Sequence, residues 1–215
     1  VGNTGSGKSR FVKDIEQLCV GDSPTKRKVL VDGKELDYAE RSAFERSSIA
    51  HLGQNMRFVL DVTVEQFVAM HARCRGKEAR IDDVVALANE ITPESVLKES
   101  KLNLLSGGQS RALMTADVAL VCDSPVVLVD EIENAGIDKE RALGLLQKSD
   151  KLVLVVTHDP HTALMARRRI VLAGGAVTAV VERTAGEASL YEALGRAYRE
   201  QRRYQTQLRK GAYLA

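Results

Sequence analysis

Close to its amino end the chain reads Gly2-Asn3-Thr4-Gly5-Ser6-Gly7-Lys8-Ser9, which matches the pattern G-x-x-x-x-G-K-[ST]. Glycines in such a loop let backbone N–H groups turn inward around phosphate oxygens, because no Cβ atom stands in the way. A helical pattern follows from about Lys8, and a helix there would point the positive end of its dipole at the same anion. Lys8 would add a mobile cation, and Ser9 would offer a hydroxyl ligand to Mg²⁺. The run therefore predicts a site for a nucleoside phosphate.

A second informative run is Val126-Val127-Leu128-Val129-Asp130-Glu131. Its unbroken apolar part predicts a strand buried on both faces, and two acids follow at the end. Asp130 would hold Mg²⁺ directly or through water, and Glu131 would orient and partly deprotonate an attacking water. Glu133 is a competing carboxylate, but Glu131 directly follows the metal-binding aspartate and is preferred as the base.

Apolar runs rich in Val, Ile and Leu alternate with helical patterns along the chain. Strands are predicted at residues 29–31, 126–129, 152–156 and 170–172, and helices at about 8–19, 63–74, 81–89 and 188–210. Strands that alternate with helices predict an α/β fold with a mostly parallel sheet covered on both faces.

Composition narrows the class of protein. A chain of 215 residues buries a sizeable core in one or two domains, and a hydrophobic content of 44% is too high for a disordered protein. The 31 Lys and Arg are nearly balanced by 29 Asp and Glu, so nothing strong indicates nucleic-acid binding. No apolar run approaches the 20 or so residues of a spanning helix, and no signal peptide is expected. Cys19, Cys74 and Cys122 are predicted to be buried or half-buried free thiols in a reducing compartment.

The run Leu105-Ser106-Gly107-Gly108-Gln109 lies between the first two. Its glycines permit close backbone approach, and a helix predicted from about Gln109 would form a second anion-binding helix terminus. Residue for residue, the run resembles the signature of the ATP-binding cassette (ABC) ATPases. The resemblance implies a head-to-tail dimer, in which the phosphate-binding loop of one subunit and the signature of the other enclose each ATP.

The resemblance also implies roles for single residues. Gln54 sits where the family has the glutamine that contacts Mg²⁺ or the attacking water, and His158 sits where it has the histidine that reaches the γ-phosphate. The expected catalytic residues are Glu131, His158 and Gln54, and the expected metal ligands are Ser9, Asp130 and Gln54. ATP is expected to contact Gly2, Asn3, Thr4, Gly5, Ser6, Gly7, Lys8 and Ser9 of one subunit and Ser106, Gly107, Gly108 and Gln109 of the other.

The resemblance covers the chain from Val1 to about Val181 and implies its organisation. We expect a P-loop NTPase (RecA-like) core formed by residues 1–56 and 105–183, with a small antiparallel β part that includes residues 29–34. Residues 57–104 are expected to form the helical signature subdomain, and residues 184–215 a C-terminal amphipathic helix.

The sequence departs from the family pattern in several places. Ile132 follows the catalytic glutamate where the family has proline, the D-loop at 134–138 is one residue longer, Arg111 lies one position early, and Asp117 stands where arginine is frequent. The strand that leads into the phosphate-binding loop, and the aromatic residue that stacks on adenine, are not in the sequence. We therefore expect them upstream of Val1 in the native protein.

The function implied is Mg²⁺-dependent ATP hydrolysis by a dimer of this chain with itself or with a homologous subunit. The first hypothesis is the nucleotide-binding subunit of a membrane transporter, in the cytoplasm on the inner face of the membrane, with the permease on a separate chain. The alternative is a soluble cytosolic ABC ATPase in assembly or repair. The pair Glu131-Ile132, in place of Glu-Pro, resembles the sequence of the ATPase of iron–sulfur cluster assembly. A non-catalytic ATP-dependent dimerisation module is a third hypothesis, against which Glu131 and His158 argue.

The C-terminal helix leaves alternatives open. It carries a net charge of about +4, and its apolar stripe has 4-3-4-3-4 spacing: Leu190, Leu194, Ala197, Gln201, Tyr204 and Leu208. The helix would either pack on the core with its arginines solvated or associate with a second copy, and contact with nucleic acid or anionic lipid is a minor alternative. His51, His71 and His161 are predicted to be ordinary surface or loop residues.

Overall fold

The structure is a computed structural model that describes residues 1–54, 56–134 and 136–213. Two compact units divide the chain. The larger comprises residues 7–157, and the smaller combines residues 1–6 with residues 158–215.

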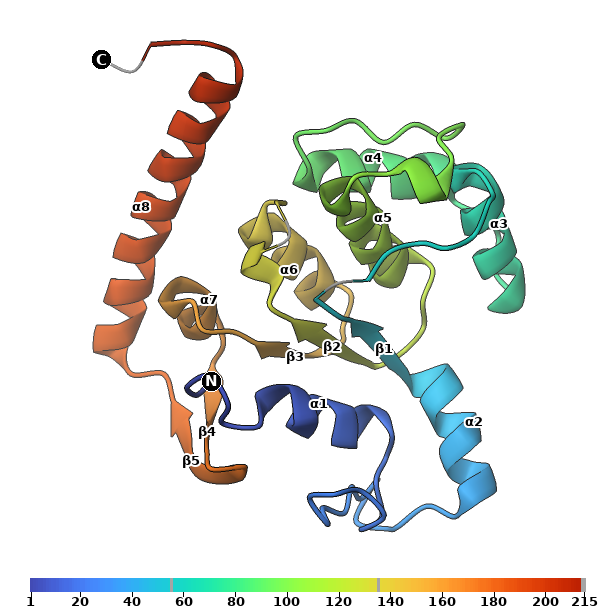
Figure 1. Cartoon of the computed structure of the whole chain (residues 1–215), viewed down its shortest axis with the longest axis vertical. Coiled ribbons are helices and arrows are strands. Elements are labelled where there is room, and N and C mark those ends of the chain that lie inside the picture. Colours follow the sequence, from blue (N-terminus) through green and yellow to red (C-terminus); the bar gives the residue numbers. More distant parts are fainter. Residues whose placement is uncertain (55, 135, 214–215) are drawn as a thin grey trace. The chain divides into compact units, whose positions relative to one another are not determined.

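The larger unit is built on a three-stranded parallel sheet, with strand order β1 (Ile49–Leu52), β2 (Val126–Asp130), β3 (Leu152–Val156) (Figure 1). Leu52 lies opposite Val129, and Asp130 lies opposite Val156. Because the strands run in the same direction, the segments that follow them leave at one edge of the sheet. The predicted α/β class with a parallel sheet is confirmed.

Helices cover both faces of this sheet. Helix α1 (Lys8–Glu16) lies on one face, and α5 (Gly107–Leu120) and α6 (Lys139–Lys148) lie on the other (Figure 1). Val12 of α1 packs with Leu128 of β2 and Val156 of β3, and all three are buried. The middle residues of β2 have no exposed surface, which confirms that this strand is buried on both faces. The apolar run 152–156 predicts the same for β3, but that prediction is wrong, because β3 is only partly buried and Leu152 is 69% exposed.

Helices α3 (Val64–Cys74) and α4 (Ile81–Ile91), followed by the short 3₁₀ helix η1 (Leu102–Leu104), confirm the helical patterns predicted in this part of the chain. Thr63 caps α3 through a reciprocal pair of hydrogen bonds with Gln66, and each of these helices buries one apolar face. Helix α4 packs against α5, the helix that begins within the signature. The boundaries 57 and 104 of a helical subdomain remain a prediction.

The smaller unit contains an antiparallel hairpin of β4 (Arg168–Ala173) and β5 (Ala176–Glu182), followed by helix α8 (Ala185–Arg209). Gly174 and Gly175, with φ of 54° and 81°, make the turn that joins the strands. The backbone of residues 1–6 is tied to this hairpin by hydrogen bonds from Leu172 N to Val1 O (2.9 Å) and from Gly175 N to Ser6 O (3.1 Å).

Several elements differ from the prediction, which did not include β1, α6 or β5. The strand predicted at residues 29–31 is wrong: only isolated bridges form, between Val20 and Lys28 and between Val31 and Lys34, and the side chain of Leu30 is 52% exposed. Helix α2 (Tyr38–Ser48) was not predicted, because it buries no side chain and so lacks an apolar stripe. Ala135, in the predicted D-loop, lies outside the described residues.

The prediction that the three histidines outside the motifs are surface or loop residues is wrong for His161, which is buried, while His51 and His71 lie in a strand and a helix and stay partly exposed. The Nδ1 atom of His51, in β1, lies 2.9 Å from a Glu16 carboxylate oxygen, and that of His71, in α3, lies 2.7 Å from an Asp117 oxygen. His161, in helix α7 (Pro160–Met165), is only 3% exposed.

Helix α8 uses a different face from the predicted stripe. The ring of Tyr191 stacks on the ring of His161, the ring of Tyr198 lies tilted against it, and Gly195 between the two tyrosines is buried. Leu190 and Leu208 of the stripe are more than half exposed. The 4-3-4 spacing therefore does not mark the face that packs on α7.

Candidate functional site

The phosphate-binding loop ends at the start of α1. Gly7 has φ 92° and is the N-cap residue, and no side chain caps the helix. The start of α1 is therefore suited to bind an anion, as the glycine pattern predicts. Lys8 is the first residue of the helix, and Ser9 is exposed beside it.

The first half of the loop belongs to the smaller unit. Ser6 N donates to Asn3 O (3.0 Å), which closes a turn. Gly2 has φ 154°, and a Cβ atom there would collide with the carbonyl oxygen of Leu172 and lie 2.6 Å from Ser6 Oγ. Only glycine fits this position.

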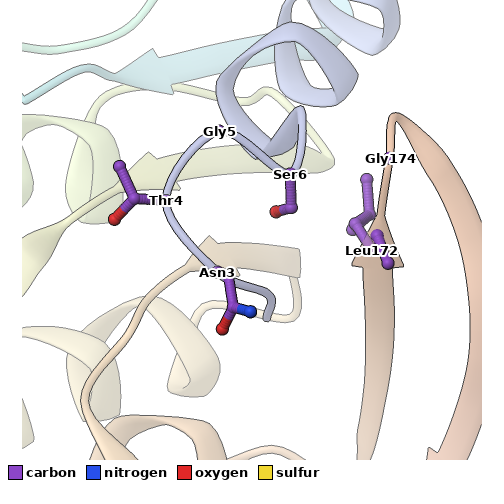
Figure 2. Close-up of a pocket in the computed structure, with 7 residues that line it drawn as sticks. Asn3, Thr4, Gly5, Ser6, Leu172 and Gly174 are labelled. Carbon is purple, nitrogen blue, oxygen red and sulfur yellow. The ribbon is translucent and has the colours of Figure 1, made fainter.

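A pocket of about 190 Å³ lies between this loop and the end of β4 (Figure 2). It is lined by Asn3, Thr4, Gly5, Ser6, Leu172, Ala173 and Gly174. Among the described residues Ser6 Oγ is buried and lacks a hydrogen-bond partner. The lining includes neither Asp130 nor Glu131, so the pocket is not by itself the place of the chemistry, which depends on those two acids.

The two acids end β2 in the larger unit. Asp130 is the last residue of the strand, and Glu131 takes a left-handed backbone conformation with φ 47°. The N–H of Glu131 donates to Val156 O at the end of β3 (3.0 Å). Gln54 follows β1, and its Nε2 donates to Glu131 Oε2 at 2.6 Å. The structure thus brings together two predicted catalytic residues that lie 77 positions apart.

Asp130 is partly buried at this edge. Burial raises the pKa of its carboxyl above the ordinary value, and the neighbouring Glu131 carboxylate raises it further, while His51 and Arg111 oppose the shift. A divalent cation would relieve the repulsion between the two acids.

Arg111 of α5 connects the same two strand ends. It is 3% exposed, and its Nη2 donates to Asp130 O at 2.8 Å while its Nη1 donates to Gly53 O. Burial lowers the pKa of its guanidinium, and the nearby carboxylates of Asp130 and Glu133 oppose that shift. In the sequence, Arg111 differs from the family pattern only by its position. Its hydrogen bonds could not be predicted, because they join residues that lie 58 and 19 positions apart in the chain.

The residues after the acids have different partners. Thr157 Oγ1 donates to Glu133 Oε1 at 2.8 Å, so this competing carboxylate is engaged beyond the end of β3. Ile132 has no exposed surface and fills the core. The departure from proline therefore has a packing role.

The signature begins α5. Ser106 is the N-cap residue, and it forms a capping box with Gln109: Gln109 N donates to Ser106 Oγ (3.2 Å), and Ser106 N donates to Gln109 Oε1 (2.9 Å). The helix starts at Gly107, two residues earlier than predicted, because Ser106 caps it there. Asp117, further along α5, is buried and bonded to His71 of α3, which joins the signature helix to a neighbouring helix.

His158 belongs to the smaller unit and precedes α7, where Asp159 caps the helix by accepting from Thr162 N (2.7 Å). Its side chain is exposed. That His158 reaches the γ-phosphate remains a prediction.

The predicted Mg²⁺ ligands have suitable chemistry. Because Gln54 Nε2 is bound to Glu131, the carbonyl oxygen of that amide is the atom left for a cation. A hydroxyl, a carboxylate and an amide oxygen are the hard ligands that Mg²⁺ prefers. No group of three or more His, Cys, Asp or Glu side chains able to hold a metal occurs within residues 1–54, 56–134 and 136–213. The residues therefore fit a cation that is completed by nucleotide phosphates and water, as is usual for Mg²⁺.

Comparisons with known proteins identify the family of the chain. The sequence profile described as ABC transporter matches residues 1–134. An uncharacterised ABC transporter ATP-binding protein of Methanocaldococcus jannaschii is 52% identical over 189 residues, which are 87% of this chain and 72% of that protein. The macrolide export ATP-binding/permease protein MacB of Shewanella oneidensis is 29% identical over 82% of this chain, but only 28% of MacB is covered.

A solved structure is similar as well. It is the dimeric, post-hydrolysis state of an ATP-binding cassette bound to ADP and Pi, with a TM-score of 0.64, 27% identity, and coverage of 85% of this chain and 84% of that chain. The predicted P-loop NTPase fold and ATP hydrolase activity are thereby confirmed. The chain belongs to the ABC transporter family, as an ATP-hydrolysing nucleotide-binding domain.

Proposed function

We propose that two copies of this chain, or one copy and a homologous subunit, close head to tail around Mg²⁺-ATP and drive a membrane permease. The observation that carries the proposal is the hydrogen bond between Gln54 and Glu131 beside Asp130, since it places an amide and two acids at one sheet edge. In this proposal the loop from Gly2 to Ser9 binds the phosphates of ATP. Ser106, Gly107, Gly108 and Gln109 close the site from the other subunit.

Each acid has its own role in the proposed reaction. Glu131 accepts a proton from the attacking water, and Gln54 holds the Glu131 carboxylate in place through its amide N–H. Asp130, Ser9 and the Gln54 carbonyl hold Mg²⁺, which would neutralise charge on the phosphates. His158 contacts the γ-phosphate.

The coupling to transport rests on the relatives. The name of MacB joins an ATP-binding part to a permease, and the chain covers only the smaller share of it. We infer that the present chain serves a permease in the same way, from the cytoplasmic side of a membrane. None of the described helices is both long enough and apolar enough to span a bilayer. Assembly or repair is not favoured by these relatives.

A surface for the permease is available next to the catalytic glutamine. Met56, Val59 and Leu60 follow Gln54 closely and are 43%, 90% and 43% exposed. We propose that these apolar side chains, exposed within one short segment, contact the permease. A permease bound to this segment would respond to movements of Gln54, because the segment follows Gln54 closely in the chain. Val59→Asp is expected to uncouple transport in the reconstituted complex and to leave the ATPase rate of the isolated chain unchanged.

The experiment that tests the proposal compares two neighbouring carboxylates. Glu131→Gln should lower the ATPase rate by a factor of about 10² or more while ATP binding persists, because the proton acceptor is lost but the phosphate-binding loop is intact. Glu133→Gln is the matched control and should hydrolyse ATP at close to the parental rate, since Glu133 faces Thr157. Parental turnover by Glu131→Gln would refute the assignment of the base.

A further inference from the structure

The hydroxyl of Ser106 already has an anionic partner within its own subunit. Ser106 Oγ donates a short hydrogen bond to the carboxylate Oε2 of Glu94, twelve residues upstream. Glu94 lies in the connection between α4 and η1 and is exposed. Its carboxylate therefore lies at the start of α5, where the helix dipole and free N–H groups favour negative charge.

The connection that carries Glu94 is fastened on both sides. Asn89 of α4 donates from Nδ2 to Val96 O (3.0 Å) and accepts from Val96 N (2.7 Å). Gln109 of the signature donates from Nε2 to Ser95 O (2.7 Å). These bonds hold Ser95 and Val96, directly after Glu94, and Glu94 N donates to Thr92 Oγ1 (3.3 Å) just before it. The fold itself therefore keeps the Glu94 carboxylate beside Ser106.

We propose that Glu94 is an internal competitor of the ATP γ-phosphate at the signature and sets how much ATP is needed to close the dimer. The inference rests on the proposed function, in which Ser106 contacts the ATP bound by the other subunit. A serine hydroxyl has one proton to donate, and in this structure that proton serves the Glu94 carboxylate. A phosphate group arriving at the same hydroxyl would meet both an occupied donor and a like charge.

Closure must therefore move the Glu94 carboxylate away from Ser106. Glu94 is exposed, so its carboxylate can rotate into water without leaving a buried charge behind. Each ATP sandwiched in the dimer displaces one such carboxylate, and a closed dimer displaces two. Glu94 thus acts as a threshold on closure and takes no part in the chemical step.

The test measures dimer formation rather than hydrolysis. Glu94→Gln and Glu94→Ala are introduced into the Glu131→Gln chain, and the dimer fraction is followed by sedimentation during titration with Mg²⁺-ATP. Removing the competing charge should lower the ATP concentration for half-maximal dimer formation by roughly tenfold or more, because charged hydrogen bonds are the strong ones. Glu99→Gln is the matched control, since Glu99 is an exposed carboxylate of the same connection, and it should leave the midpoint unchanged.

The outcomes separate this inference from the proposed function. If the Glu131→Gln chain binds no ATP or forms no dimer, the proposed function fails, and this inference fails with it. If that chain dimerises and both Glu94 variants need as much ATP as it does, or more, Glu94 is no competitor and only this inference is overturned. A lower midpoint in both Glu94 variants but not in Glu99→Gln supports it.

Discussion

Arg111 is a single side chain on which two strand ends depend. Its guanidinium is buried and satisfies the carbonyl oxygens of Gly53 and Asp130. Replacement by methionine keeps the length of the side chain but removes the donor that Arg111 gives to each oxygen, at about 1–3 kcal/mol for each lost bond to a buried group. We expect Arg111→Met to lower the free energy of unfolding by about 2 kcal/mol or more and to impair ATPase activity.

Urea denaturation and steady-state ATPase assays check this prediction. Arg73→Met is the control, because Arg73 is an exposed arginine on α3. An Arg111→Met chain as stable and active as the Arg73→Met chain would contradict the bridging role.

Asp14 gives stability a specific dependence on pH. Its side chain is 1% exposed and accepts from Thr25 Oγ1 (2.7 Å), Arg27 Nη1 (2.8 Å) and Arg10 Nε (2.9 Å). Burial acts to raise the pKa of Asp14, but these hydrogen bonds outweigh it, and the pKa is lowered from the ordinary value of 3.8. A carboxyl with a lower pKa in the folded state stabilises the fold above its unfolded pKa, and this contribution is lost as the pH falls through the folded pKa.

The comparison of parent with Asp14→Asn isolates this contribution. The parent should be more stable by about 2 kcal/mol at neutral pH, because a charged hydrogen-bond network is lost in the variant. The difference should stay constant down to about pH 4 and shrink below it, as measured by urea denaturation across pH. A difference that stays the same at pH 3 would show that ionisation of Asp14 does not stabilise the fold.

At the scale of elements, helices α7 and α8 are joined by one aromatic stack. The His161 ring lies 5.0 Å from that of Tyr191, at an interplanar angle of 11°, and 5.5 Å from that of Tyr198. A Cβ atom on Gly195 would lie 3.2 Å from His161 Nε2, so glycine permits this close approach. Beyond this stack, α8 from Arg203 onward is mostly exposed.

His161→Ala should therefore release α8. We expect faster amide exchange across Ala185–Arg209, because truncation of a buried aromatic ring removes about 2–4 kcal/mol of packing. His161→Phe should restore protection, since it keeps the stack, and Tyr204→Ala on the exposed side should have no effect. Unchanged exchange in His161→Ala would mean that other contacts hold α8.

The elements that could be predicted are those whose signal is local. Strands β2 and β3 are unbroken apolar runs, and α3 and α4 bury a regular apolar face, so periodicity locates them. Residues 29–31 have the same apolar composition, but with charged neighbours and a turn at Asp32 and Gly33 they form no strand, and only Val31 takes part in an isolated bridge. Helix α2 has a capping box and no buried side chain, so its periodicity is weak.

The candidate site also has parts that the sequence predicts and parts that it does not. Its motif residues were located because each motif is one short run at the end of a strand or the start of a helix. The contacts of Arg111 and Glu94 were not, because they join residues that only the folded chain brings together. His161 was wrongly placed at the surface for the same reason, since the tyrosines that bury it lie about 30 residues further along the chain.

At the scale of the whole molecule, a head-to-tail dimer predicts complementation between two inactive chains. Gly107→Asp should inactivate the signature without unfolding α5, because a side chain at Gly107 meets open space and aspartate suits the first turn of a helix. Mixed with Glu131→Gln, it forms heterodimers in which one of two sites has both an intact base and an intact signature. The equimolar mixture should regain about a quarter of the parental ATPase rate if chains pair at random and sites act independently.

ATPase assays on each variant and on the mixture check this prediction, at protein concentrations that saturate dimer formation. The control mixes Glu131→Gln with a chain that carries both changes, which restores no intact site. A mixture as inactive as its components would exclude active sites shared in this way.

The left-handed backbone of Glu131 affects which inactivating mutations the fold would tolerate. A φ of 47° is strained for any residue with a side chain, and glycine adopts it freely. Glu131→Gly would abolish the proton acceptor and yet relax the backbone by about 1 kcal/mol. The dead chain would fold at least as well as the working one, so the quality control that removes unstable variants would not remove it. Only selection on turnover keeps a glutamate at this position.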